Sequence, residues 1–277
     1  MSLEAGRLKV LMIGAHPDDC DMKFGGCAAL YSQLGHQVKL VSVTNGSTGH
    51  HVIGGVELAK KREDETRRSS EVLDIEYEVL DIHSNELTPS LPFRKQMIRL
   101  IREYHPDLMV THRPNDYHPD HRYTSQLVQD AAYTLTVPGV CPLTAHMQND
   151  PAIVYCHDNF QKPYPFQPEV AVAIDDVIEK KLDMLHCHAS QVYEWLPYNR
   201  GHLDEVPEGD AARREWLGTQ YKPYSEGVAD MARSRLIEIY GEERGNSVQY
   251  AEAFEGCEYG APLTEENRAE LFPFLPE

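Results

Sequence analysis

The alternation of short apolar runs with longer amphipathic segments constrains the fold of this chain more than any other feature. The apolar runs consist mainly of β-branched and aliphatic residues, as expected of strands that are buried on both faces. Most of them are followed by a segment with helical spacing. This alternation predicts an α/β fold with a Rossmann-like, doubly wound, mostly parallel sheet. The predicted strands are 9–14, 38–43, 77–82, 107–111, 152–156 and 170–174, and the predicted helices are 22–34, 56–73, 91–104, 119–134 and 176–188.

The composition of the chain changes after Gln191. An aromatic stretch is followed there by a polar run, a predicted helix near 225–240 and a proline-rich tail. No internal repeat or low-complexity linker separates this part from the rest. We therefore expect a single domain over residues 1–277, with a core at about 8–191 and a C-terminal cap at 192–277 that packs on the same core.

Charge and length exclude several classes of partner. The 277 residues include 26 Lys and Arg against 44 Asp and Glu, which gives a formal net charge of −18. A chain this acidic repels phosphate backbones and anionic lipid, so we expect neither nucleic acid nor a membrane as partner. No apolar stretch approaches the roughly 18–20 residues that cross a bilayer, and we expect a soluble, cytoplasmic protein. The six cysteines form no CxxC pair, so they predict neither a zinc knuckle nor a disulfide framework.

A histidine and two adjacent carboxylates directly follow the first predicted strand. His16 and Asp19 lie three residues apart on a tight turn that Pro17 stiffens by fixing one φ angle. This rigidity favours a metal ion. Because neighbouring side chains diverge, Asp18 and Asp19 cannot easily share the ion, and we expect one carboxylate to bind it while the other faces the substrate side. The alternative is that Asp18 and Asp19 cap the helix that follows, as aspartate often does.

A second cluster, 115–122, follows the fourth predicted strand. If a helix begins there with Pro119, His118 and His121 lie one turn apart on the same side of its opening. One such pair could be a satisfied polar cluster. Two clusters at the carboxyl ends of two parallel strands, where ligands bind in such sheets, favour a metal site instead.

Three of these side chains form a candidate ligand set: His16, Asp19 and His121. Three protein ligands with an open fourth position suit a catalytic zinc, which activates water. The same donors also suit the iron of an oxygenase, so the ligand types alone leave the chemistry open.

The two motifs together resemble the LmbE-like, or PIG-L, family of zinc-dependent N-deacetylases. The resemblance rests on Ala15-His-Pro-Asp-Asp19 and on His118-Pro-Asp-His121. It covers about residues 8–191 well and the rest thinly. Supporting matches are Gly25-Gly26, Thr44-Asn45-Gly46, Arg62-x-x-Glu65, His188-Ala-Ser-Gln191 and Ala251-Glu-Ala-Phe254.

The resemblance implies a reaction and a cofactor. Water activated by one zinc ion per chain attacks the carbonyl of an N-acetyl group on a sugar and releases acetate and a free amine. Another divalent ion, such as Fe²⁺, could serve. The implied zinc ligands are again His16, Asp19 and His121.

The resemblance also implies three catalytic side chains. Asp18 would be the general base that takes the proton of the water. His118 would be the cation that stabilises the oxyanion and protonates the leaving nitrogen, with Asp120 holding its imidazolium form. A histidine paired with a carboxylate does keep its proton near neutrality, which agrees with these roles.

Four further residues are candidates for binding substrate: Arg62, Asn45, His188 and Trp195. Arg62 matches a family arginine that holds substrate oxygens, although helical spacing equally allows a surface pair with Glu65. Asn45 could face the sugar or could only turn the chain. Trp195 could stack on a sugar ring.

The sequence departs from the family pattern at two positions. Cys20 stands where many members have glutamate. Asp116 stands where mycothiol-type enzymes have an oxyanion-binding tyrosine, and Tyr117 follows it. The stretch Asp-Tyr-His-Pro-Asp-His, residues 116–121, resembles the bacillithiol-type and general bacterial members more. Family membrane enzymes that act on inositol lipids carry an anchor that this sequence lacks, so we expect a small soluble glycoconjugate as substrate. By analogy with relatives, a homo-oligomer is possible.

Two other functions remain open at this point. One is an iron-dependent oxidative enzyme that uses the same His/Asp/His site. The other is a non-catalytic carbohydrate-binding relative, which the two departures would suggest. The leading hypothesis is a zinc hydrolase that removes an N-acetyl group from an N-acetylglucosamine-type glycoconjugate.

Overall fold

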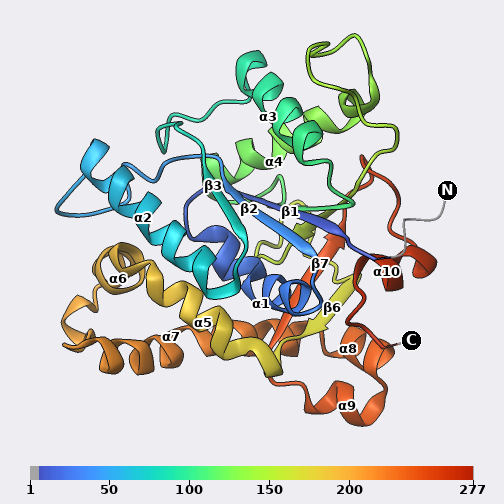
Figure 1. Ribbon diagram of the computed structural model, residues 1–277. Helices are drawn as coiled ribbons and strands as arrows, with labels where there is room; N and C mark the ends of the chain where they lie inside the picture. Colours follow the sequence, from blue (N-terminus) through green and yellow to red (C-terminus); the bar gives the residue numbers. More distant parts are fainter. Residues whose placement is uncertain (1–5, 277) are drawn as a thin grey trace.

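The computed structural model describes residues 6–276 and shows one seven-stranded sheet with helices on both faces (Figure 1). The strand order is β3-β2-β1-β4-β5-β7-β6. The first five strands in this order are parallel, and β7 runs antiparallel to both of its neighbours. The strands are β1 (Lys9–Gly14), β2 (Gln37–Ser42), β3 (Glu76–Val79), β4 (Leu108–Thr111), β5 (Ala152–Cys156), β6 (Val170–Ala173) and β7 (Ala251–Gly256).

The helices form two layers around this sheet. One face is covered by α1, α2 and α5, and the other by α3 and α4. The five are α1 (Asp19–Gln33), α2 (Gly55–Leu73), α3 (Leu91–Tyr104), α4 (Pro119–Ala132) and α5 (Ile178–Cys187). After α5 come a π-helical turn (Ser190–Trp195), α6 (Leu196–Arg200), α7 (Asp210–Met231), α8 (Arg233–Tyr240), α9 (Glu242–Ser247) and α10 (Glu265–Leu271).

Successive residues of β1 pack into different layers, because side chains alternate across a strand. Val10 and Met12 belong to the core under α1, whereas Leu11 and Ile13 belong to the core under α3 and α4. All four are completely buried. The continuous apolar runs in the sequence thus reflect strands covered on both faces, and the predicted α/β, doubly wound, mostly parallel fold is confirmed.

The order of the strands places two loops together. The chain proceeds from β1 through β2 to β3 on one side and then returns to add β4 on the other side of β1. The loops after β1 and β4 therefore diverge from neighbouring strands at the carboxyl edge of the sheet. This switch point is the usual ligand-binding position in such folds, and both predicted motifs lie there.

The C-terminal third, predicted as a cap, also contributes β7 to the sheet, which the sequence analysis did not predict. Its sequence, Ala-Glu-Ala-Phe-Glu-Gly, carries two glutamates, which are unusual in a buried strand. Glu252 is nevertheless buried, with only 3% of the residue exposed. Its burial is tolerated because the carboxylate accepts hydrogen bonds from Lys181 Nζ and from the backbone N–H groups of Gly26 and Cys27, at 2.8–2.9 Å. These contacts connect β7 to α1 and α5.

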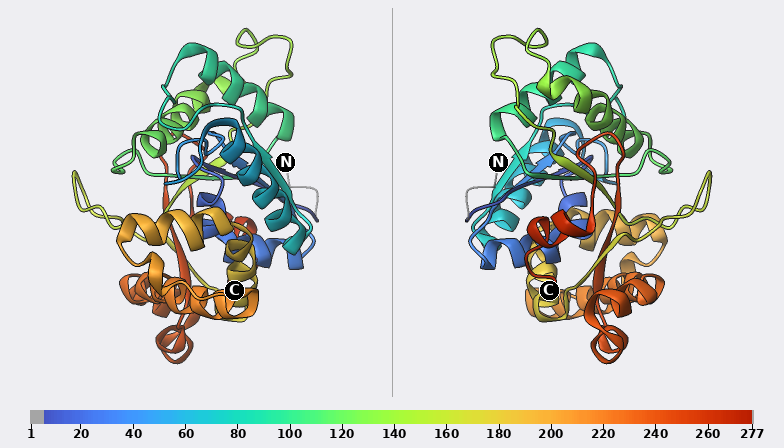
Figure 2. Two further views of the ribbon diagram at one scale, coloured as in Figure 1. Left: turned by 90° about the vertical axis from the view of Figure 1, so that its left-hand side faces the viewer. Right: turned by 90° about the vertical axis from the view of Figure 1, so that its right-hand side faces the viewer.

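The helix predicted near 225–240 is two helices, since α7 ends at Met231 and α8 begins at Arg233. Figure 2 shows α7, α8 and α9 gathered at the end of the molecule opposite α3 and α4. The last helices therefore lie on the α5 side of the sheet.

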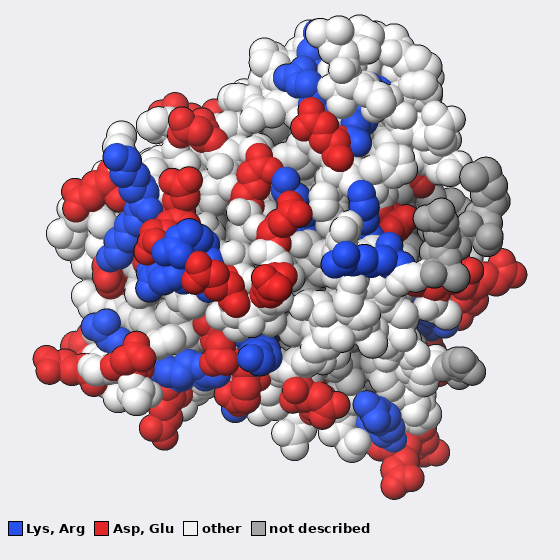
Figure 3. All heavy atoms as spheres, viewed as in Figure 1, with Lys and Arg blue, Asp and Glu red and all other residues white. Residues whose placement is uncertain are grey.

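The visible surface carries both signs of charge. Figure 3 shows acidic and basic side chains interspersed, with no continuous basic stripe on that face. Within residues 6–276, no helix is both long and apolar enough to span a bilayer.

Candidate active site

The turn after β1 is held by backbone contacts that fix Asp19. The Asp19 Oδ2 atom accepts hydrogen bonds from the backbone N–H groups of Ala15, at 3.0 Å, and His16, at 2.7 Å. Asp18 stands just before α1, but its side chain makes no capping hydrogen bond. Asp18 is thus the N-cap residue by position only, and the Asp19 carboxylate bonds to the turn before α1, so the interpretation of the two side chains as helix caps is wrong.

The first turn of α4 places Pro119, His118 and His121 as predicted. The helix begins with Pro119, and His118 precedes it as the N-cap residue. His118 Nδ1 accepts a hydrogen bond from the backbone N–H of Asp120 at 3.1 Å. The rings of His118 and His121 are 5.0 Å apart, on the same side of the helix opening. If His118 is neutral, this contact leaves its proton on Nε2.

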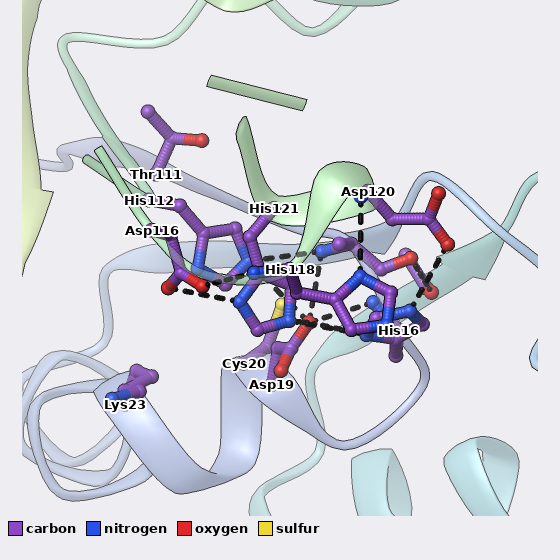
Figure 4. A network of polar contacts seen from close by, with 12 residues as sticks. His16, Asp19, Cys20, Lys23, Thr111, His112, Asp116, His118, Asp120 and His121 are labelled. Carbon is purple, nitrogen blue, oxygen red and sulfur yellow. Dashed lines mark hydrogen bonds and ion pairs between the residues drawn. The ribbon is translucent and has the colours of Figure 1, made fainter. Parts of the chain in front are cut away.

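Three donor atoms from the two loops converge (Figure 4). His121 Nε2 lies 3.2 Å from His16 Nδ1 and 3.5 Å from Asp19 Oδ2. His16 Nδ1 lies 3.3 Å from Asp19 Oδ2. A tetrahedral ion with bonds of about 2.0–2.2 Å keeps its ligand atoms about 3.3–3.6 Å apart. The three side chains predicted as ligands are thus spaced to hold one divalent ion and to leave a position open.

His112 also lies in this cluster, although the sequence analysis assigned it no role. Its Nε2 atom is 3.3 Å from Asp19 Oδ2 and accepts a hydrogen bond from the backbone N–H of Ala15 at 3.1 Å. Two other sets of donors, His16/His118/His121 and Asp19/His112/His121, also lie within 4.8 Å of one another. We favour the set with His16, because His16 Nδ1, Asp19 Oδ2 and His121 Nε2 lie 3.2–3.5 Å from one another. The signal for His112 was its position directly after the fourth strand.

Asp120 contacts a different histidine from the one expected. Its Oδ2 atom is 3.2 Å from His16 Nε2 and accepts a hydrogen bond from the backbone N–H of Asn85 at 2.7 Å. The pairing expected with the imidazolium of His118 is not formed. Burial, followed by the neighbouring His16 and His121, lowers the pKa of His118 to about 4. Without a bound ion, the neutral form of His118 is therefore favoured.

The remaining electrostatics favour opposite charges at the centre of the site. Burial alone would lower the pKa of His16, but hydrogen bonds to Asp120 and Asp19 outweigh it and raise that pKa to about 9. Burial alone would raise the pKa of Asp19, but His121 and His112 hold it well below its usual value. Asp19 is therefore ionised, as a metal ligand must be, whereas His16 is protonated without an ion and would have to release the proton of Nδ1 when an ion binds.

Arg62 forms a buried ion pair with the candidate base. Its Nη2 atom donates to Asp18 Oδ1 at 2.7 Å, and the residue is only 2% exposed. The alternative pairing with Glu65 is wrong, because Glu65 accepts hydrogen bonds from the N–H and hydroxyl groups of Ser190 at 2.8 and 2.6 Å. Gly46 makes room for the guanidinium: it has φ +70°, and a Cβ there would lie 2.5 Å from Arg62 Cδ.

The other three predicted substrate residues lie in different surroundings. Asn45 uses both polar atoms within the protein, on Asp81 and on the backbone N–H of Ser47, which supports a structural role. His188 is completely buried, with Nε2 3.1 Å from Asp21 Oδ1, so it cannot touch a substrate in this conformation. Trp195 is partly exposed on the π-helical turn.

Trp195 nevertheless lies close to Arg62. A Cβ on Gly49 would be 3.6 Å from Arg62 Nη1 and 3.8 Å from Trp195 Nε1, so Gly49 separates the two side chains. The indole also stacks on Tyr198 with 6.0 Å between centroids. Trp195 thus stays a candidate for the rim of the site.

A family model described as "PIG-L: GlcNAc-PI de-N-acetylase" matches residues 11–132, which include both motifs. A diacetylchitobiose deacetylase of Thermococcus kodakarensis is 31% identical over 209 residues, which cover 69% of this chain and 75% of that protein.

Two further comparisons extend this result. A 4-oxalmesaconate hydratase of Pseudomonas putida is 23% identical over 199 residues, covering 69% of this chain and 76% of the hydratase. The solved structure of an N,N'-diacetylchitobiose deacetylase from Pyrococcus horikoshii superimposes with a TM-score of 0.69 at 24% identity and covers 91% of this chain and 84% of its own. At that identity the structural likeness establishes the fold.

The fold and the convergent side chains define an α/β protein with a site suited to one divalent ion. The chain belongs to the PIG-L family, as the paired motifs predicted. At the level of enzyme class, the prediction of an N-deacetylase is confirmed by the family and by this relative.

Proposed function

We propose that this protein is a zinc-dependent hydrolase that removes the N-acetyl group from an N-acetylglucosamine-type glycoconjugate. The observation that carries the proposal is the convergence of His16 Nδ1, Asp19 Oδ2 and His121 Nε2 within 3.5 Å of one another. The diacetylchitobiose deacetylase, which covers most of the chain, supports the substrate class.

Within this proposal, His16, Asp19 and His121 hold the ion. When bound, a divalent ion at this position supplies Lewis acidity that polarises a carbonyl and makes water more acidic. The predicted catalytic side chains surround the same place, and the steps assigned to them below concern protons alone.

Asp18 is the proposed base. Arg62 Nη2 donates a hydrogen bond to Asp18 Oδ1 at 2.7 Å, which fixes the Asp18 carboxylate beside the turn. Asp18 takes the proton of the attacking water, and the same proton can then pass to the nitrogen as the C–N bond breaks. The second proton of the water stays on the new carboxyl group and passes to the amine or to solvent as acetate leaves, so the protons balance without an imidazolium.

His118 then has a different proposed role from the one predicted from the sequence. As a neutral ring with Nδ1 accepting from the Asp120 backbone, it carries its proton on Nε2. From there it can donate a hydrogen bond to the developing oxyanion. Such donors contribute about 3 kcal/mol each to transition-state stabilisation.

The proposal is tested by the release of amine from N,N'-diacetylchitobiose and from other N-acetylglucosamine conjugates. Protein loaded with one equivalent of zinc is expected to release amine and acetate in equal amounts. Protein stripped by a chelator is expected to be inactive until zinc is restored.

Parallel assays of the same protein test the competing functions. Hydration of 4-oxalmesaconate without amine release would favour the chemistry named for the Pseudomonas relative. Oxygen uptake with iron would favour an oxidative enzyme. Binding of the sugars without turnover by the zinc-loaded protein would favour a carbohydrate-binding relative.

A further inference from the structure

We infer that Asp116 is a positioning residue of the metal site, whose carboxylate orients the imidazole of His121. The inference rests on the proposed function, because it concerns how that function's ion is held. It also gives a role to a position that appeared in the sequence only as a departure from the family pattern.

Both carboxylate oxygens of Asp116 are engaged at the entrance of α4. Oδ1 accepts a hydrogen bond from the backbone N–H of His118 at 2.9 Å, and Oδ2 lies 3.0 Å from His121 Nδ1 (Figure 4). The side chain is only 8% exposed. Arg122 Nη1 donates to the carbonyl oxygens of Asp116 and Tyr117, both at 2.8 Å, which holds the same turn. The carboxylate is thus fixed relative to the backbone and to the ring.

The contact with His121 decides which ring nitrogen is free. Within residues 6–276, no group makes a well-aligned hydrogen bond with His121 Nδ1. The Asp116 carboxylate is close, although the ring N–H is turned off the direct line to it. A carboxylate there favours the proton on Nδ1 and leaves the lone pair of Nε2 toward His16 and Asp19.

The other candidate histidine is supported in the same way. Asp120 Oδ2 lies 3.2 Å from His16 Nε2, which leaves His16 Nδ1 toward the shared centre. The six residues 116–121 thus supply one candidate ligand and the orienting carboxylates for both histidines. Partners of this kind fix the tautomer and the orientation of metal-binding histidines.

If Asp116 had a purely structural role, its only important contact would be the hydrogen bond that Oδ1 accepts from the backbone N–H of His118. Two substitutions separate the roles. In Asp116→Asn the amide oxygen can still accept the His118 N–H, but the amide NH₂ donates to His121 Nδ1 and moves the ring proton to Nε2. In Asp116→Ser the hydroxyl can keep the turn bond, and the carboxylate is removed.

The experiment measures zinc affinity by competition with a chromophoric chelator, together with thermal unfolding of the metal-free proteins. Asp116→Asn and Asp116→Ser are expected to raise the zinc Kd about 10- to 100-fold, with the unfolding of the metal-free proteins close to that of wild type. The control is Asp107→Asn, since Asp107 also accepts a backbone N–H, that of Lys9 at 2.8 Å, at the start of β4. It should bind zinc as wild type does.

Wild-type zinc affinity in both Asp116 variants would overturn the inference while leaving the proposed function intact. A wild-type protein that binds no zinc would instead count against the proposed function. The absorption spectrum of the cobalt-loaded protein gives a second readout, because a changed orientation of His121 alters the ligand field at the ion. A spectrum unchanged by both substitutions would also overturn the inference.

Discussion

The Asp18→Asn protein is expected to bind one zinc ion per chain and to lose about 10²- to 10⁴-fold in kcat. In the wild-type protein Arg62 Nη2 donates to Asp18 Oδ1 at 2.7 Å. The asparagine oxygen can still accept this hydrogen bond, but it cannot take a proton from water. Metal content is measured by elemental analysis and turnover by amine release. KM is expected to change little, because the substitution removes proton transfer rather than substrate contacts.

The adjacent carboxylate provides the matched comparison. Asp19→Asn should lower metal content as well as turnover, because Asp19 Oδ2 lies with His16 Nδ1 and His121 Nε2 in the candidate ligand set. A fully active Asp18→Asn protein would contradict the assignment of the base. Equal loss of metal in both variants would contradict the division of roles between Asp18 and Asp19.

The Arg62→Met protein is expected to lose about 3–5 kcal/mol of unfolding free energy, because removing one partner of a buried ion pair leaves the other unpaired. Arg62 is 2% exposed and Asp18 is 8% exposed, so water replaces the lost partner poorly. Urea unfolding of the metal-free proteins measures the change.

Arg67→Met is the control on the same helix. Arg67 pairs with Asp64 and Glu71 on the exposed face of α2, where solvent screens such pairs. It should unfold much as wild type does. Similar urea midpoints for Arg62→Met and Arg67→Met would show that the buried pair does not stabilise the protein as argued.

The sequence was sufficient to predict which segments meet. The segments that form β1 and β4 are almost entirely apolar, as is typical of parallel strands that are buried on both faces. The carboxyl ends of neighbouring parallel strands lie at one edge of the sheet. His16 and Asp19 after one strand and His121 after the other were therefore expected to be neighbours. Pro119 marked the start of α4 because proline fits the first turn of a helix.

Side-chain partners within that site could not be predicted in the same way. Asp120 was expected to contact His118, but it contacts His16 on the loop after β1. His188 matched a family motif, yet it is completely buried against Asp21. Motif spacing predicts where the backbone lies. The contact that a carboxylate makes depends in addition on its rotamer and on distant segments of the chain that pack against it.

The strand β7 was missed for a related reason. Glutamates at two of its six positions argue against a buried strand when the sequence is considered alone. Glu252 is accommodated because Lys181 and two backbone N–H groups of α1 meet it. These partners lie at least 71 positions away in the chain, so no local pattern could reveal them.

Anomalous diffraction at the zinc absorption edge, from crystals of the zinc-loaded protein, tests the central claim most directly. We expect a single peak at about 2.0–2.2 Å from His16 Nδ1, Asp19 Oδ2 and His121 Nε2. A peak bonded to His112 or His118 in place of one of these three, or no peak between the loops after β1 and β4, would contradict it.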